Sequence, residues 1–181
     1  MQNQSDSPVM NKTMETILTR RSIRKYEQDK PVSEDDLRAI LTAGLCAPSA
    51  ANRQPVRLIA VRDRATLAKL STAKGEAEMI ARAAMAIVVC GDSTAQTYRE
   101  FLIEDCAAAV QNMLLAIHSL GLGAVWCGVP SIMEDCVGVY RDALALPGHI
   151  IPLATIALGV PAETRAPMNR YDEAKIHLDR W

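Results

Sequence analysis

The sequence predicts a single domain in which helices and strands are mixed, and three observations lead to this prediction. Short runs rich in Val and Ile alternate along the chain with longer stretches of helical spacing. Of the 181 residues, 49% are hydrophobic and 23% are charged, a composition that supports one apolar core. No repeat, linker or low-complexity stretch interrupts the sequence. We therefore expect one domain over residues 13–181, preceded by a flexible leader at residues 1–12.

The first half of the chain is expected to form two helices and then two strands. A helix is predicted over residues 13–20. A second helix begins after Ser33, which can cap it ahead of an acidic first turn, and it ends near Cys46. The runs at 56–61 and 86–90 are rich in Val and Ile and therefore predict strands. The apolar residues between them indicate one or two further helices.

The second half of the chain is dominated by one long helical stretch at residues 98–120, which Gly121 is expected to end. Its positions are so apolar that it is either the central helix of the core or a helix covered on one side by a partner chain. Polar residues interrupt it, so we interpret it as a helix of a soluble protein rather than a membrane span. Strands are expected at 124–129 and 151–159, with a helix between 131 and 144.

Composition and missing motifs exclude several classes of function. Twenty basic and twenty-one acidic residues give a net charge of -1, which favours neither nucleic acid nor an anionic membrane as a partner. The five cysteines include no C-x-x-C pair and no zinc spacing, so we expect no metal and a reduced, cytoplasmic setting. The N-terminus lacks the features of a secretory signal. Phosphate-binding loops, dinucleotide fingerprints and hydrolase triads are also missing, and we assign no catalytic acid, base or nucleophile.

A basic cluster at residues 17–26, "ILTRRSIRKY", is the first candidate site. Arg20 and Arg24 share one helical face if the helix continues, and Ser22 adds a hydroxyl between them. Such a cluster either keeps the end of a helix solvated or binds a phosphate through charge-assisted hydrogen bonds. Because the positive charge is local, the ligand should be small.

Two further polar stretches need an explanation. The segment 47–55, "APSAANRQP", ends a helix and forms a loop, which is either a capped turn or part of a binding site. The other is the irregular tail, where Arg170 is an isolated cation.

Taken together, four blocks follow one another in a specific order: "RRSIR", "PSAANRQP", "GLGAVWCGV", and "LGVPAE" followed by "NRY". With these blocks the chain resembles the nitroreductase family of FMN-dependent flavoproteins over residues 13–181. The resemblance implies an α+β fold, a three-layer α/β/α sandwich whose central sheet is mixed and mainly antiparallel. It also implies a homodimer with the FMN sites at the subunit interface.

The resemblance also implies roles for the polar residues. Arg20, Arg21 and Ser22 would hold the FMN phosphate and ribityl chain, and Arg170 would be a C-terminal phosphate ligand. Arg24 would reach the pyrimidine edge of the flavin, where negative charge develops on reduction. The remaining implied cofactor-binding residues are Pro48, Ser49, Ala50 and Asn52, in a loop from the other subunit, and Trp126, Cys127 and Gly128, whose backbone lies against the ring.

The implied reaction is a ping-pong oxidoreduction. NADH or NADPH would deliver a hydride to FMN, and a nitroaromatic, a quinone or a similar small acceptor would then be reduced. Related members of this fold remove halogens or cleave flavins, so those reactions are alternatives. A non-enzymatic FMN-binding or sensor protein is another, and a dimer whose basic cluster only caps a helix is the third. Val56 stands where the family often has an aromatic residue, which reduces the stacking surface for a substrate.

Overall fold

The computed structural model describes residues 11–130 and 132–181, and most of the predicted leader therefore lies outside the described residues. The helices are α1 (Lys12–Thr19), α2 (Glu34–Leu45), α3 (Arg64–Ser71), α4 (Met79–Arg82), α5 (Arg99–Ser119) and α6 (Glu134–Leu144), with short 3₁₀ turns η1 (Ala50–Asn52) and η2 (Glu173–Lys175). The strands are β1 (Val56–Val61), β2 (Met85–Asp92), β3 (Gly123–Gly128) and β4 (Ile150–Gly159).

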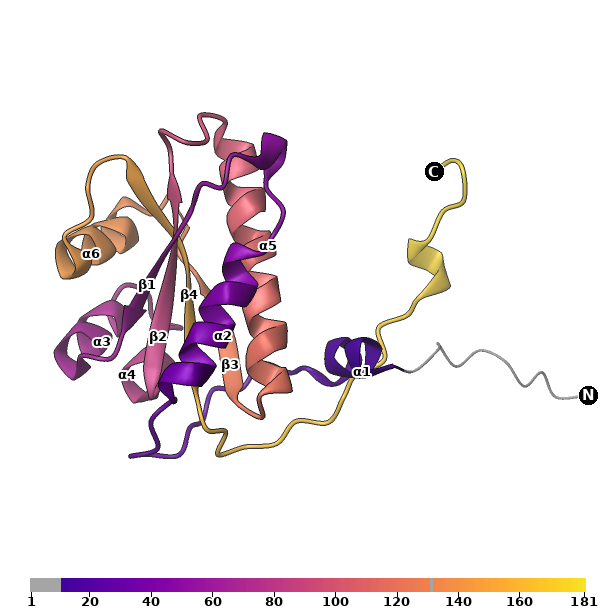
Figure 1. Cartoon of the computed structure of the whole chain (residues 1–181), viewed down its shortest axis with the longest axis horizontal. Coiled ribbons are helices and arrows are strands. Elements are labelled where there is room, and N and C mark those ends of the chain that lie inside the picture. Colours follow the sequence, from indigo (N-terminus) through magenta and orange to yellow (C-terminus); the bar gives the residue numbers. More distant parts are fainter. Residues whose placement is uncertain (1–10, 131) are drawn as a thin grey trace, which may run out of the picture.

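The four strands form one sheet in the order β1-β2-β4-β3, and every neighbouring pair runs antiparallel. A parallel bridge between Ser22 and Ala124 extends the sheet beyond β3. Helices α2 and α5 cover one face, while α3, α4 and α6 cover the other (Figure 1). The predicted three-layer α+β sandwich with a mainly antiparallel sheet is therefore confirmed.

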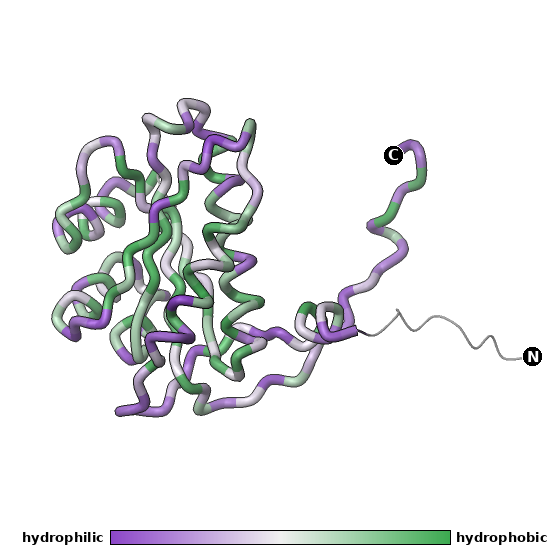
Figure 2. Tube along the Cα trace, in the orientation of Figure 1, coloured by the Kyte–Doolittle hydropathy of each residue, from purple (hydrophilic) through white to green (hydrophobic). Residues whose placement is uncertain are grey.

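Two apolar clusters fill the spaces between the layers. The strands are the most continuously hydrophobic part of the trace (Figure 2), and every residue of β2 is buried. On one face α2 approaches α5 so closely that a side chain on Gly44 would meet Met113, whose Cγ lies 2.9 Å from the position of the missing Cβ. Close approach of two helices at a small residue buries apolar area that would otherwise stay in water.

Helix α5 is the central helix of the fold. Among the described residues it is the one helix that is long and apolar enough to cross a membrane by length and composition alone. Its buried residues, however, pack against α2 and the sheet, which is the environment of a core helix. The sequence allowed either a central core helix or a helix covered by a partner chain. The buried face of α5 is explained by the first of these. Phe101 and Ile103 near its start remain exposed.

The helix boundaries follow local capping. Asn11 accepts a hydrogen bond from the Met14 amide at 2.9 Å, so α1 begins at Lys12, close to the predicted start. Ser33 caps α2 as predicted, accepting from the Asp36 amide at 3.0 Å. The long helix ends just before Gly121, whose φ of 77° lies in the left-handed region that glycine tolerates.

Two segments project away from this layered body: α1, and the tail that follows β4 (Figure 1). No residue of α1 is buried, and Ile17 and Leu18 are exposed on it. The tail exposes further large apolar side chains, and they are Met168, Tyr171, Ile176, Leu178 and Trp181. Apolar surface on projecting segments is typical of an interface with another chain.

Candidate functional site

The basic cluster lies along the outer edge of β3. The Ile23 amide donates to the Ala124 carbonyl at 2.9 Å, which fixes the segment beside the strand. Tyr26 then pairs with Pro161, so the same segment also touches the chain just after β4. The buried Tyr26 hydroxyl lies 2.8 Å from the Ile23 carbonyl and 2.9 Å from the Ala157 carbonyl. The backbone that carries Arg20, Ser22 and Arg24 is thus anchored to the sheet.

Arg20 and Arg170 come together in space although 150 positions separate them in the sequence. The pKa of Arg20 is lowered by burial and, next, by the positive charges of Arg170 and Arg21. Like charges held close to one another are unfavourable unless an anion binds between them. Arg20 and Arg170 thus lie near enough for their charges to interact, and their shared role as phosphate ligands stays a prediction.

Two neighbours complete the surroundings of this cluster. The Arg21 guanidinium donates to the Ala166 carbonyl and so ties the tail to the basic segment. His118, at the end of α5, lies 2.8 Å through Nε2 from the Thr19 hydroxyl. Burial and the charge of Arg20 lower the pKa of His118, which disfavours the protonated form of this imidazole. His118 is therefore disfavoured as a further positive charge beside Arg20.

A cavity of about 670 Å³ opens beside β3 and joins residues from four parts of the chain. Three predicted residues line it, Arg24, Trp126 and Cys127. The other lining residues are Lys25, Lys74, Gly75, Glu76, Glu78, Met79, Arg82, Val125, Glu163 and Arg165. Each acidic residue lies near a cation: Glu76 near Lys74 at 3.7 Å, Glu78 near Arg82 at 3.7 Å and Glu163 near Arg165 at 2.9 Å. Because the lining has five cations and three acids, its net charge is positive.

The exposed edge of β3 offers backbone donors beside the cavity. The Ala124 carbonyl points outward to Ile23, whereas the Val129 amide points inward to the Leu153 carbonyl of β4 at 3.0 Å. Backbone groups alternate between the two edges of a strand, so the amides of Trp126 and Gly128 point outward. The Cys127 amide points toward β4 instead. Of the two implied backbone donors, Gly128 therefore has its amide at the free edge and Cys127 does not, while the Trp126 amide is also at that edge.

The Cys127 side chain packs against α4 on one face of the sheet. Its Sγ lies 3.5 Å from the Met79 Sδ, and burial raises the pKa of the thiol. A protonated thiol in apolar surroundings behaves as a small hydrophobic group rather than a nucleophile. Cys127 therefore forms part of the cavity wall.

The 48–54 loop, which carries Pro48, Ser49, Ala50 and Asn52, lies at the other end of α5. Its Ala50 amide donates to Asp105 near the start of that helix, and Figure 1 shows η1 at this end, away from α1. At a rise of 1.5 Å per residue, Asp105 and His118 are separated by about 20 Å along the helix. Within one chain, the structure does not bring this loop together with Arg20 and Arg170, the arginines expected to bind the phosphate.

A sequence model of the nitroreductase family matches this chain over residues 17–77 and 68–160. The chain belongs to the nitroreductase family. It is 45% identical over 168 residues to a provisionally named NADH dehydrogenase/NAD(P)H nitroreductase of Methanothermobacter thermautotrophicus, covering 93% of this chain and 87% of that protein.

Solved structures of the nitroreductase family agree with this fold. A provisionally named NADH dehydrogenase/NAD(P)H nitroreductase from Parabacteroides distasonis superposes with a TM-score of 0.89 at 41% identity, covering 95% of this chain and 100% of that one. A provisionally named nitroreductase from Desulfovibrio desulfuricans, solved in complex with FMN, gives 0.81 at 32% identity, covering 96% and 99%.

In this nitroreductase-family chain, sequence reasoning missed Lys74, which lines the same cavity as Arg24. Lys74 stands in a short polar turn between α3 and α4, where a lysine followed by glycine is common on any surface. No periodicity or spacing separates it from the other lysines. Its proximity to Cys127, whose pKa its charge lowers in part, becomes visible only in the fold.

Proposed function

We propose that this protein is an FMN-dependent oxidoreductase that passes a hydride from NADH or NADPH to a small acceptor such as a nitroaromatic or a quinone. The proposal is supported by membership of the nitroreductase family and by a relative of the same fold that binds FMN. The single observation that carries it is the proximity of Arg20 to Arg170, next to the segment that pairs with β3 through Ser22. Two converging guanidinium groups favour a phosphate.

The residues of this chain fit the parts of FMN. Arg20, Arg170 and Ser22 would bind the phosphate end, and Arg21 would hold the tail in place through Ala166. Arg24 and Lys74 would face the edge of the ring that becomes negative on reduction. A cavity of about 670 Å³ falls in the range usual for small-molecule sites. Bound FMN would supply the hydride-accepting ring, and the outward amides of Trp126 and Gly128 would orient it.

We infer a ping-pong reaction that uses the cavity beside β3 for both reactants. The nicotinamide and the acceptor would use the same opening in turn, so the oxidised nicotinamide must leave before the acceptor binds. The protein's task is to position each reactant and to hold positive charge at Arg24 and Lys74. No side chain is required as acid or base, because solvent can supply the protons.

We also propose a homodimer in which each flavin site uses both chains. The 48–54 loop lies about 20 Å along α5 from the end that carries His118, beside Arg20, so it cannot cover the same chain's phosphate site. Pro48, Ser49, Ala50 and Asn52 would instead cover the flavin of the partner subunit. The apolar side chains on α1 and the tail would form much of the interface. Free thiols at all five cysteines support a reducing, cytoplasmic location.

The proposed function is tested with the purified protein. We expect a flavin absorbance spectrum, loss of that absorbance on addition of NADH or NADPH without oxygen, and its return on addition of a quinone or nitroaromatic. A flavin that stays oxidised with both nicotinamides would identify a non-enzymatic FMN binder. A colourless protein that binds no added FMN would contradict the proposal altogether.

A further inference from the structure

The 48–54 loop holds an unfavourable backbone conformation. Three of its residues, none of them glycine, have positive φ: Ala51 at 51°, Asn52 at 53° and Gln54 at 48°. Such a conformation costs on the order of 1 kcal/mol or more at each residue and persists only when the surroundings impose it. Ala51 and Asn52 are exposed, so packing of their own side chains does not impose it.

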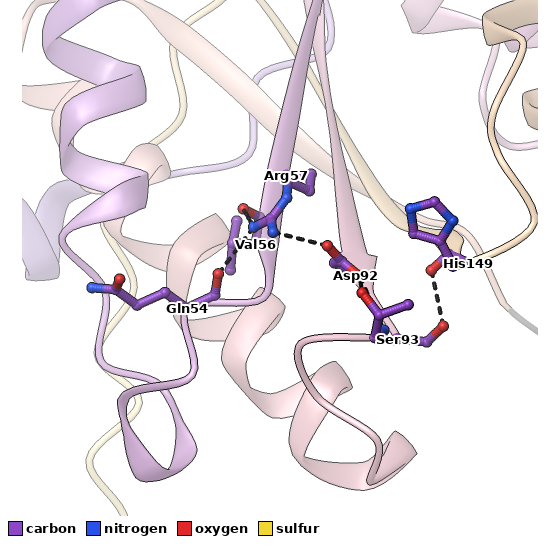
Figure 3. Close-up of polar contacts among 7 residues, drawn as sticks. Gln54, Val56, Arg57, Asp92, Ser93 and His149 are labelled. Carbon is purple, nitrogen blue, oxygen red and sulfur yellow. Dashed lines mark hydrogen bonds and ion pairs between the residues drawn. The ribbon is translucent and has the colours of Figure 1, made fainter.

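Two sets of contacts hold the ends of this loop. On the side of β1, Arg57 donates to the Gln54 carbonyl at 3.0 Å and to Asp92 Oδ2 at 2.8 Å, as Figure 3 shows. The Gln54 amide also donates to the Ser49 hydroxyl at 2.9 Å, which closes the loop on itself. On the side of α5, the Ala50 amide donates to Asp105 Oδ1 at 2.8 Å. Asp105 thus links the loop to the central helix.

Asp105 is an unusual residue for a core helix. It is only 5% exposed, and its second oxygen, Oδ2, is buried without a hydrogen-bond partner among the described residues. A buried carboxylate that is only half satisfied is costly, and an apolar residue of similar shape is often as stable or more stable. Stability of the helix alone therefore does not account for an acidic residue here. Among the described residues, the one hydrogen bond of the Asp105 carboxylate is the bond from the loop at Ala50.

We propose that Asp105 is a positioning residue, which holds the 48–54 loop in the conformation that covers the flavin of the partner subunit. The proposal rests on the shared site proposed above. The negative charge makes the bond to the Ala50 amide charge-assisted and therefore stronger than a neutral one. Asp105 does not touch the cofactor and acts through the backbone of Ala50.

The test compares Asp105→Leu, which keeps the branched shape without an acceptor, with Asp105→Asn, which keeps the acceptor without the charge. FMN binding is measured by fluorescence titration of the apoproteins. Asp105→Leu should bind FMN roughly tenfold or more weakly, the size expected from losing a hydrogen bond to a charged group. Asp105→Asn should stay within roughly threefold of wild type, since its amide oxygen can still accept from Ala50.

Two readouts separate positioning from general stability. The melting temperature of apo Asp105→Leu should equal or exceed that of wild type. Hydrogen exchange of the Ala50 amide in the apoprotein should become fast in Asp105→Leu and remain slow in Asp105→Asn. Glu104→Leu is the matched control, because it removes an exposed acid from the adjacent position and should leave FMN affinity unchanged.

A double-mutant cycle identifies the bond itself. Ala50→Pro deletes the donor, and the extended conformation of Ser49, with φ of -138° and ψ of 150°, is compatible with a following proline. Ala50→Pro alone should weaken FMN binding, whereas in the Asp105→Leu background it should cause no further loss. Additive losses would overturn the proposal, because the two residues would then act independently.

The remaining outcomes also decide the matter. Wild-type FMN affinity in Asp105→Leu would overturn the positioning role and leave the proposed function intact. Loss of FMN together with a lower melting temperature and normal exchange at Ala50 would overturn it too, since the defect would then be one of folding. A wild-type protein that binds no FMN would overturn both proposals.

Discussion

Replacement of Arg170 by alanine should change ligand affinity and apoprotein stability in opposite directions. In the apoprotein Arg170 lowers the pKa of the neighbouring Arg20, which means that the two positive charges disfavour each other. Removing Arg170 relieves this repulsion, and because the side chain is exposed the gain in stability should be small. When FMN is bound, the same substitution removes a charge-assisted contact to the phosphate.

The magnitude follows from the strength of that contact. A hydrogen bond to a charged group contributes about 1.5–3 kcal/mol. Since about 1.4 kcal/mol corresponds to a factor of ten, the dissociation constant of FMN should rise roughly ten- to a hundredfold. The loss should shrink as the salt concentration rises, because Arg170 is exposed to screening.

The assay compares FMN with riboflavin, which lacks the phosphate, by fluorescence titration of the apoprotein. Arg170→Ala should weaken FMN binding and leave riboflavin binding unchanged. Arg180→Ala, an exposed arginine further along the same tail, is the control and should affect neither ligand. An equal loss of affinity for both ligands would refute the phosphate assignment, and so would no loss for either.

Three further predictions concern the ring edge, the interface and pH. Arg24→Ala and Lys74→Ala should each lower the reduction potential of bound FMN, because each removes positive charge from the cavity; spectroelectrochemistry measures this, and an unchanged potential in both would contradict the placement. Ile17→Glu, on the exposed face of α1, should give folded monomers that lose FMN, as measured by light scattering and absorbance. The pKa of His118 is lowered by burial and by Arg20, so the unfolded chain binds a proton more readily. The free energy of unfolding of the apoprotein should therefore fall as pH drops through about 6.5, and His118→Gln should flatten this dependence in urea titrations at pH 5–8.

Much of the fold could be predicted from the sequence, because local signals decided it. The Val- and Ile-rich run at 56–61 coincides with β1, and the run at 86–90 forms the centre of β2. Ser33 and Gly121 mark helix ends through hydrogen bonding and backbone geometry that depend on few neighbours. Such signals survive in almost any tertiary context.

The parts of the site that depend on tertiary contacts could not be predicted in this way. Which amides of β3 face outward depends on which edge pairs with β4, so the choice between Cys127 and Gly128 needed the sheet. Lys74 is brought to the cavity by the fold, in which Met79 of α4 lies against Cys127 of β3. In the sequence Asp105 is an acidic residue that borders a long apolar stretch, and its partner Ala50 is 55 positions away.

One expectation about α5 also changes with the structure. If a partner chain covered this helix, as one interpretation of its sequence allows, a charge in mid-helix such as Ala109→Glu would break the dimer. Ala109 is fully buried within its own chain, so this substitution would place a charge in the core and disrupt the fold itself. Substitutions on α1 are the cleaner way to separate subunits.

Helix α5 contacts the 48–54 loop near its start, through Asp105, and the segment before Arg20 at its end, through His118. In the proposed dimer each α5 helix therefore contacts the loop that covers one flavin and the segment that binds the phosphate of the other. FMN bound at the first site would order the α5 helices of both chains, so the second FMN would bind to a site that is already ordered. FMN binding should then be cooperative, with a Hill coefficient above one, and the two flavins of a dimer would communicate although they never touch.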